Sequence, residues 1–125
     1  MIKSNNSSLA LTVLRVGISA LMLGHGIPKI NRLFESPIEF ADPIGLGPTV
    51  SLILTLIGEV VAPVLIIVGW KTRLAAIPAF ITMVVAAFVV HGADPFRKKE
   101  MAIIYALVFL VIMIGGPGKF SIDKN

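Results

Sequence analysis

The chain has 125 residues, of which 56% are hydrophobic and 14% are charged, and its mean hydropathy is +0.93. A soluble domain is about 25% charged, and a domain this small has too little core to bury so much apolar surface. The composition therefore excludes an ordinary soluble domain and predicts an integral membrane protein. The formal charge of +4 comes from basic residues scattered between apolar segments, which indicates membrane-interface anchors and not a nucleic-acid-binding surface.

Four apolar segments are candidates for membrane-spanning helices, which need about 17–25 residues. The first, residues 9–27, is too long for the apolar core of a signal peptide and lacks a small-residue cleavage site, so we retain it as a helix. The others cover residues 49–70, 74–90 and 100–114, and all four end at breaks that contain glycine. Segments such as 103–114 do not alternate apolar and polar residues, which excludes the strands of a membrane β-barrel.

These segments predict an all-α integral membrane protein. We expect an antiparallel four-helix transmembrane bundle, formed by residues 1–125 as a single domain, with both termini on the same side of the bilayer. The longest connection, Lys29 to Pro48, is partly apolar and is expected to lie at the membrane interface as a short helix or a lid. Lys and Arg are five on each predicted side, so the positive-inside rule does not determine the orientation.

Two charged residues lie deep inside the predicted helices, where charge is costly and marks function. Arg15 is 12 residues from Ile27, and Glu59 is 10 residues from Thr49, which gives them similar depths at about 1.5 Å per residue. We therefore predict an ion pair between Arg15 and Glu59. Such a pair either serves only to hold two helices together or takes part in function, and the sequence leaves both open.

A second group of ionisable residues is predicted at one membrane boundary. His25 and Lys29 share a helix face at the end of the first helix, His91 ends the third helix, and Glu100 begins the fourth. His and Lys can donate hydrogen bonds to a carbonyl or an anion, and Glu can exchange protons. We expect His25, Lys29 and His91 to bind an oxygen-bearing ligand, with Glu59 and Glu100 as catalytic groups; alternatively, the histidines only cap helix ends.

Metal centres are not predicted, because no spacing resembles that of a zinc site. His25 and His91 could in principle be the axial ligands of a haem, but a macrocycle fits badly at the boundary of so small a bundle. The chain has no cysteine, so it can form neither a disulfide nor a dithiol redox couple.

Several motifs together resemble the DoxX family of small four-helix bacterial membrane proteins. In chain order they are Leu14-Arg15-Val16-Gly17, Gly24-His25-Gly26-Ile27-Pro28-Lys29, Gly58-Glu59, the segment 69–76, His91, Glu100 and the segment 116–123. Their order and spacing, over nearly the whole chain, form the resemblance. It implies a four-helix fold, a location in the bacterial plasma (inner) membrane, and a role near respiratory or thiol redox chemistry, since some relatives are described as membrane subunits of thiosulfate:quinone oxidoreductases.

Three functional hypotheses follow from the resemblance and the polar residues. The first is a quinone-linked oxidoreductase subunit or redox-complex component, without a metal or flavin of its own, whose electrons come from a bound substrate or from a soluble or membrane partner subunit. The second is a non-catalytic scaffold or assembly factor that binds a protein or a lipid. The third is a small transporter with Arg15 and Glu59 on its path, which would require a homo-oligomer because four helices are few for alternating access. The sequence leaves open whether the protein is an enzyme.

Overall fold

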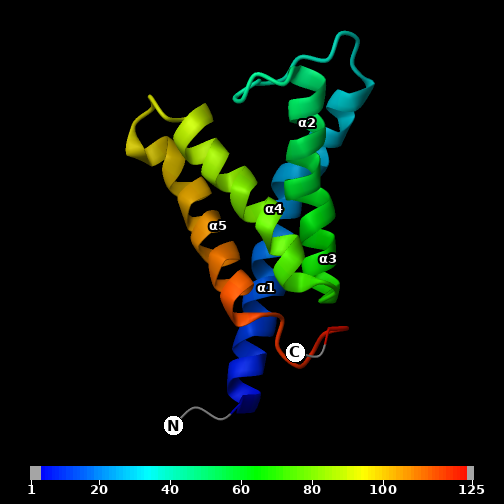
Figure 1. Ribbon diagram of the computed structural model, residues 1–125, viewed down its shortest axis with the longest axis vertical. Coiled ribbons are helices and arrows are strands. Elements are labelled where there is room, and N and C mark those ends of the chain that lie inside the picture. The colour runs from blue at the N-terminus through cyan, green and yellow to red at the C-terminus, as the bar shows by residue number, and fades with distance from the viewer. Residues whose placement is uncertain (1–3, 124–125) are drawn as a thin grey trace.

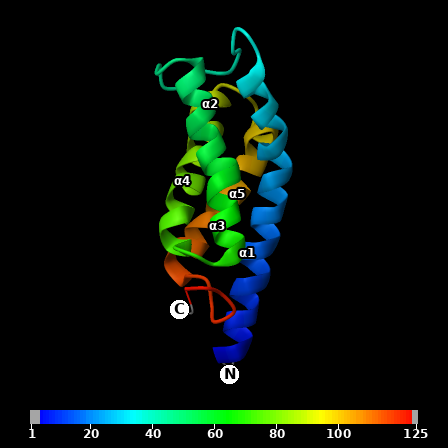
Figure 2. The same cartoon turned by 90° about the vertical axis from the view of Figure 1, so that its right-hand side faces the viewer.

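The computed structural model describes residues 4–123, and within this range the chain is helical and contains no β-strand. The helices form four rods that reverse direction at each connection (Figures 1 and 2). In chain order the elements are α1 (Ser4–Gly26) with η1 (Ile27–Phe34), α2 (Pro48–Leu56) with η2 (Ile57–Val61) and α3 (Ala62–Val68), α4 (Thr72–Val85) with η3 (Ala86–Val90), and α5 (Phe96–Gly115). η1 is a 3-10 helix, whereas η2 and η3 are π-helical turns. The prediction of an all-helical protein is confirmed.

Three of the rods are long and apolar enough to cross a membrane: Asn6–Phe34, Pro48–Val68 and Thr72–Val90. α5 is less apolar, because its first turns contain the charged residues 97–100. Large apolar side chains on the outer faces, such as Leu21, Leu74 and Leu107, are more than half exposed. Apolar surface of this extent is typical of a protein whose helices face lipid.

The first rod is longer than predicted. The residues Gly26-Ile27-Pro28 predict a helix end, but the chain continues as η1 to Phe34. Pro28 follows Gly26, whose backbone remains helical (φ −83°, ψ −40°), so the proline marks the change from α1 to η1 and does not end the rod. The irregular connection is therefore restricted to residues 35–47, which pass over one end of the molecule in Figure 2. We call this end, which also contains the connection between η3 and α5, the loop end.

The opposite end, which we call the turn end, contains the beginning of α1, the turn from α3 to α4, and residues 116–123 (Figure 1). The turn is tight because Gly69 (φ 74°) and Lys71 (φ 51°) both adopt the left-handed backbone conformation. Asp123 holds the segment after α5 against this turn: its carboxylate oxygens accept the backbone N–H groups of Lys71 and Thr72, each at 2.8 Å. Burial opposes ionisation of Asp123, but these hydrogen bonds outweigh it and lower the pKa of the carboxyl group.

The apolar core lies where α1, α3, α4 and α5 meet. Met22, Ile66, Phe109 and Ile112 are almost fully buried there. α4 contributes small side chains to the same core, namely Ala75, Ala76 and Ala79. Small residues allow α5 to pack closely along α4.

Candidate functional site: a buried ion pair that borders two chambers

A buried ion pair joins the end of the first rod to the middle of the second. Nζ of Lys29, in η1, lies 2.6 Å from Oε1 of Glu59, in η2. The Glu59 side chain is 4% exposed and the Lys29 side chain is 33% exposed. The carboxylate is therefore enclosed, whereas the ammonium group remains partly accessible. A charged group in an apolar interior requires a partner of this kind, because an unpaired buried charge is very costly.

Two local features bring Lys29 and Glu59 together. The first rod continues through η1, which places Lys29 about one helical turn beyond Gly26. Gly26 itself lies against η2: a Cβ at this position would be 2.5 Å from the carbonyl oxygen of Glu59, so glycine permits an approach that alanine would prevent. The second feature is the π-helical turn that contains Glu59. Turns of this kind occur frequently at functional sites.

The predicted ion pair between Arg15 and Glu59 is wrong, because Arg15 has other partners. Its guanidinium group, 2% exposed, donates hydrogen bonds to backbone carbonyl groups of two segments. Nε donates to Pro117 O at 2.9 Å, Nη1 to Ile66 O at 2.8 Å and to Ile67 O at 2.6 Å, and Nη2 to Phe120 O. Arg15 therefore connects α1 to the end of α3 and to the segment after α5.

Arg15 and Glu59 lie at different depths because the first rod is longer than predicted. Ile27 and Thr49 were expected at the same membrane boundary, but the first rod continues to Phe34 before the chain turns. Glu59 consequently lies beside Gly26 and Lys29. Arg15, lower in the first rod, lies beside the last turn of α3.

The larger of two chambers at this pair has a volume of about 490 Å³ and lies between α2, η2, α4 and the connection 35–47. α2 and α4 diverge toward the loop end (Figure 1). The lining is mostly apolar; the polar residues in it are Lys29, Ser51, Thr55, Glu59, Thr82 and His91. This size and this mixture of many apolar and few polar groups are typical of small-molecule sites, which measure about 300–1,000 Å³.

The smaller chamber, about 210 Å³, is bordered by residues of α1, η1, η2, α4, η3 and α5. It shares Lys29, Glu59 and His91 with the larger chamber. His25 and Tyr105 also border it, and their rings meet edge to face with centroids 5.7 Å apart. Protonatable side chains from the first, second and fourth rods, together with His91 directly after η3, therefore gather around one small space next to the ion pair.

His91 has its own acidic partner at the loop end. Its Nδ1 lies 2.9 Å from Oδ2 of Asp94, three residues further along the chain. This hydrogen bond, together with the nearby Lys98 and Lys99, lowers the pKa of the Asp94 carboxyl group, although desolvation opposes the shift. A carboxylate beside Nδ1 accepts a hydrogen bond from that nitrogen in the tautomer that carries its proton there.

The structure brings together four of the five predicted site residues. His25, Lys29, Glu59 and His91 all border the smaller chamber. Glu100 is exposed in α5 and borders neither chamber. Whether any of the five binds a ligand or takes part in catalysis remains a prediction.

Sequence reasoning missed three residues of this region. Tyr105 is the only tyrosine in the chain and lies in an apolar helix, which is a usable signal because a buried hydroxyl group needs a partner. Lys98 borders the smaller chamber, but its position within a charged segment made it resemble an interface anchor. Asp94 was interpreted only as part of a helix break.

The described residues 4–123 contain no group of three or more His, Asp or Glu that could bind a metal ion. The haem interpretation of His25 and His91 also meets a difficulty of space. The chamber that both histidines border measures about 210 Å³, which is below the range of about 300–1,000 Å³ for ordinary small-molecule pockets.

These features define a polytopic helical membrane protein with an ion pair that borders two chambers. Residues 10–92 match the model of the DoxX family; this segment extends from α1 to the residue after His91. The chain belongs to the DoxX family, as its motifs predicted.

Relatives of similar length support this assignment. A protein of Haemophilus influenzae described as uncharacterized is 29% identical over 92% of this chain and 89% of its own length. The inner membrane protein YphA of Escherichia coli is 28% identical over the same shares of the two chains. A second H. influenzae protein, also described as uncharacterized, is 26% identical over 94% of this chain and 83% of its own length. No solved structure matches the chain significantly.

Proposed function

We propose that this DoxX-family protein is the quinone-binding subunit of a membrane oxidoreductase or redox complex. The observation that supports this proposal is the Lys29–Glu59 pair, in which an enclosed carboxylate and a partly accessible ammonium group border a mostly apolar chamber of about 490 Å³. A quinone has carbonyl oxygens that accept hydrogen bonds and an apolar isoprenoid tail. Its chemistry therefore matches both parts of this lining.

Lys29 and His91 are the residues proposed to bind the quinone carbonyl oxygens. The Lys29 ammonium has three N–H donors, and its hydrogen bond to Glu59 uses one. His91 borders the same chamber and interacts with Asp94 through Nδ1, so Nε2 is the ring nitrogen proposed to contact the ligand. With a proton on both ring nitrogens it donates to a quinone carbonyl oxygen, and with Nε2 unprotonated it accepts from a quinol hydroxyl group. His25 borders the smaller chamber, where its proposed role is to support proton supply.

Reduction of a bound quinone to a quinol takes up two electrons and two protons. Glu59 is proposed to transfer protons to the reacting oxygen, and Lys29 to stabilise the carboxylate that results. His25, His91 and Tyr105 border the chamber beside Glu59 and are proposed to return protons to it from water at the loop end. The chain has no cysteine pair to carry electrons, so the proposed donors are a partner subunit or thiosulfate, of which two ions join through a new S–S bond with the loss of two electrons.

We further propose that α5 is the fourth span of an antiparallel transmembrane bundle in a bacterial inner membrane. After its charged first turns, α5 is apolar to Gly115, and Phe109 and Ile112 belong to the shared core. The beginning of α1 and the segment after α5 lie at the same end of the molecule (Figure 1), which supports both termini on one side. The E. coli relative is called an inner membrane protein.

Quantifying the quinone that co-purifies with the full chain tests the proposal. We expect the wild type to retain quinone and Lys29→Gln to lose it by about tenfold, the equivalent of one hydrogen bond from a charged donor. Arg32→Gln is the matched control, because Arg32 lies in the same η1, is exposed, and hydrogen-bonds to the Glu39 carbonyl at 3.3 Å. Absence of quinone from every preparation, with none bound after addition, contradicts the proposal, as does equal loss in both variants.

Activity assays separate the proposal from its alternatives. If the protein is a redox subunit, thiosulfate or sulfite reduces added quinone in its presence, and Glu59→Gln slows this reaction. A scaffold instead co-purifies with a specific partner and shows no chemical phenotype in Lys29, His25 or His91 variants. A transporter supports uptake into liposomes, and Glu59→Gln reduces that uptake.

A further inference from the structure

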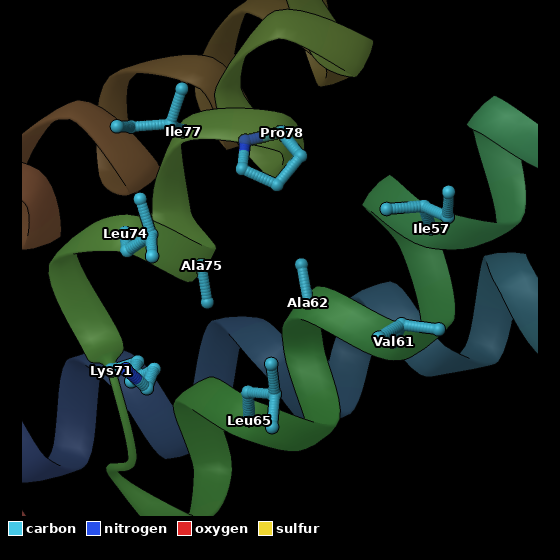
Figure 3. Close-up of a pocket in the computed structure, with 9 residues that line it drawn as sticks. All are labelled: Ile57, Val61, Ala62, Leu65, Lys71, Leu74, Ala75, Ile77 and Pro78. Carbon is cyan, nitrogen blue, oxygen red and sulfur yellow. The ribbon is translucent and has the colours of Figure 1, made fainter.

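A second, separate groove lies on the outer surface between α3 and α4, near the turn end. Its volume is about 340 Å³, and Figure 3 shows Ala62 and Ala75 pointing into the space between the two helices. All of its lining residues except one are apolar: Ile57, Val61, Ala62, Leu65, Leu74, Ala75, Ile77 and Pro78. The exception is Lys71, which lies at the turn-end limit of the groove (Figure 3).

The groove faces the surroundings of the protein at membrane depth. Val61, Leu74 and Ile77, which border it, are each more than two-fifths exposed, and all three belong to the segments suited to spanning a membrane. Trp70, next to Lys71, is 45% exposed. Tryptophan is enriched where the hydrocarbon meets the headgroups, so Lys71 lies at headgroup level and the apolar groove extends from it into the hydrocarbon.

Backbone preference does not explain the lysine at this position. Lys71 has φ 51°, a left-handed conformation that glycine or asparagine adopts more easily. Within residues 4–123 it is the one non-glycine residue with a positive φ. Strained positions of this kind cluster at binding sites, which indicates that the ammonium group of Lys71 is what the position requires. Its Nζ lies 5.3 Å from the centre of the Trp70 ring, an arrangement that holds the charge beside the groove.

Charge is also distributed unequally between the two ends. Within residues 4–123 the turn end has three exposed cations, Lys71, Arg73 and Lys119, in addition to the buried Arg15, against the single carboxylate of Asp123. At the loop end, beside the Lys29–Glu59 pair, four cations face five carboxylates: Arg32, Arg97, Lys98 and Lys99 against Glu35, Glu39, Asp42, Asp94 and Glu100. A net positive end attracts anionic lipid.

We propose that this groove binds one anionic phospholipid, with an acyl chain between α3 and α4 and the headgroup phosphate on Lys71. The proposal goes beyond the quinone site, although Ile57 and Pro78 border both the groove and the larger chamber. An ammonium group binds phosphate as a point charge, and the apolar lining replaces the contacts that the acyl chain makes in the bilayer. The contact between the headgroup phosphate and Lys71 distinguishes anionic from zwitterionic lipids, and the acyl chain in the groove fixes where the lipid binds.

Native mass spectrometry of the full chain tests the proposal with phosphatidylglycerol and phosphatidylethanolamine of identical acyl chains. We expect the wild type to retain phosphatidylglycerol preferentially and Lys71→Asn to lose this preference by about fivefold, the effect of one cation at a membrane surface. Asparagine tolerates the left-handed backbone, so this variant keeps the turn, and Lys71→Arg should keep the preference. Lys119→Asn, at the same end and outside the groove lining, is the matched control.

Three results would overturn the proposal: equal retention of the two lipids by the wild type, equal loss in the Lys71 and Lys119 variants, or displacement of the lipid by soluble glycerol phosphate. The first would mean that the groove holds acyl chains without headgroup recognition, the second that the charge of the whole end acts diffusely, and the third that the acyl chain contributes nothing. Glu59→Gln is expected to leave lipid retention unchanged, so this proposal and the quinone proposal fail independently.

Discussion

Removing Lys29 is expected to destabilise the protein more than removing Glu59. Breaking a fully buried ion pair costs about 3–5 kcal/mol. Lys29→Met leaves the Glu59 carboxylate, only 4% exposed, without its cation, so we expect a loss of about 3 kcal/mol near neutral pH. Glu59→Gln leaves the Lys29 side chain, which is 33% exposed, and an amide oxygen that still accepts its hydrogen bond, so the expected loss is about 1 kcal/mol.

The double variant Lys29→Met/Glu59→Gln separates this reasoning from a simple packing effect. It contains no unpaired buried charge, so we expect it to be more stable than Lys29→Met alone by about 1 kcal/mol or more. Its loss of about 2 kcal/mol would then be about 2 kcal/mol smaller than the sum of the two single losses, which is a measurable coupling energy. Arg32→Met, an exposed cation in the same η1, should change stability by no more than about 0.5 kcal/mol. The assay is equilibrium unfolding in mixed detergent micelles, followed by circular dichroism. If Glu59→Gln costs as much as Lys29→Met, or if the double variant is the least stable, the pair does not act as described.

Three further predictions concern other parts of the fold. Arg15→Met removes the donor to four backbone carbonyl groups and should lower the free energy of unfolding by about 3–5 kcal/mol in the same assay. Arg15→Lys should restore only part of this stability, because an ammonium group lacks the planar fork of donors. Full recovery in the lysine variant would contradict the hydrogen bonds described for Arg15. Because the pKa of Asp123 is lowered from 3.8, its contribution to stability is present above that pH and is lost as the pH falls further. The protection factors of the amides in residues 116–123, which compare each exchange rate with the intrinsic rate at the same pH, should therefore fall at low pH in the wild type. An identical pH response in Asp123→Asn would argue against this. Gly26→Ala would place a Cβ 2.5 Å from the Glu59 carbonyl oxygen and should destabilise the protein by about 1–3 kcal/mol. Gly24→Ala, with no atom within 4 Å of the added Cβ, should be neutral or slightly stabilising. Equal effects of the two substitutions would show that the first rod does not approach η2 this closely.

The helices could be predicted because bilayer thickness sets the length of an apolar segment. The segments 9–27, 49–70 and 74–90 all correspond to rods suited to spanning. The sequence also predicted that His25, Lys29 and His91 would gather, because antiparallel helices bring their boundary residues to the same depth. Those three residues do border one chamber.

The partners of the charged residues could not be predicted, for two physical reasons. Pro28 resembles a helix end, but it marks only the change from α1 to η1, and the continuation to Phe34 shifts the first rod relative to the second. The partners of Arg15 are backbone carbonyl groups, which every residue has, so no residue type marks them. An assignment based only on opposite charges therefore joined Arg15 to Glu59.

Arg15 and Lys29 differ in the chemistry that they leave available. Arg15 distributes its donors over carbonyl groups of Ile66, Ile67, Pro117 and Phe120, and neither a guanidinium group nor a carbonyl group acts as a general acid or base near neutral pH. Its role is therefore to hold segments together.

Lys29 instead faces a single carboxylate, and both groups of this pair can gain or lose a proton. The pair also borders two chambers, whereas Arg15 borders none of the three cavities described. Glu59→Gln and Arg15→Lys should consequently differ in kind: the first should slow quinone reduction more than it changes stability, and the second should change stability more than quinone reduction. If the rate of quinone reduction follows stability in both variants alike, the Lys29–Glu59 pair is a structural contact and the chamber requires another explanation.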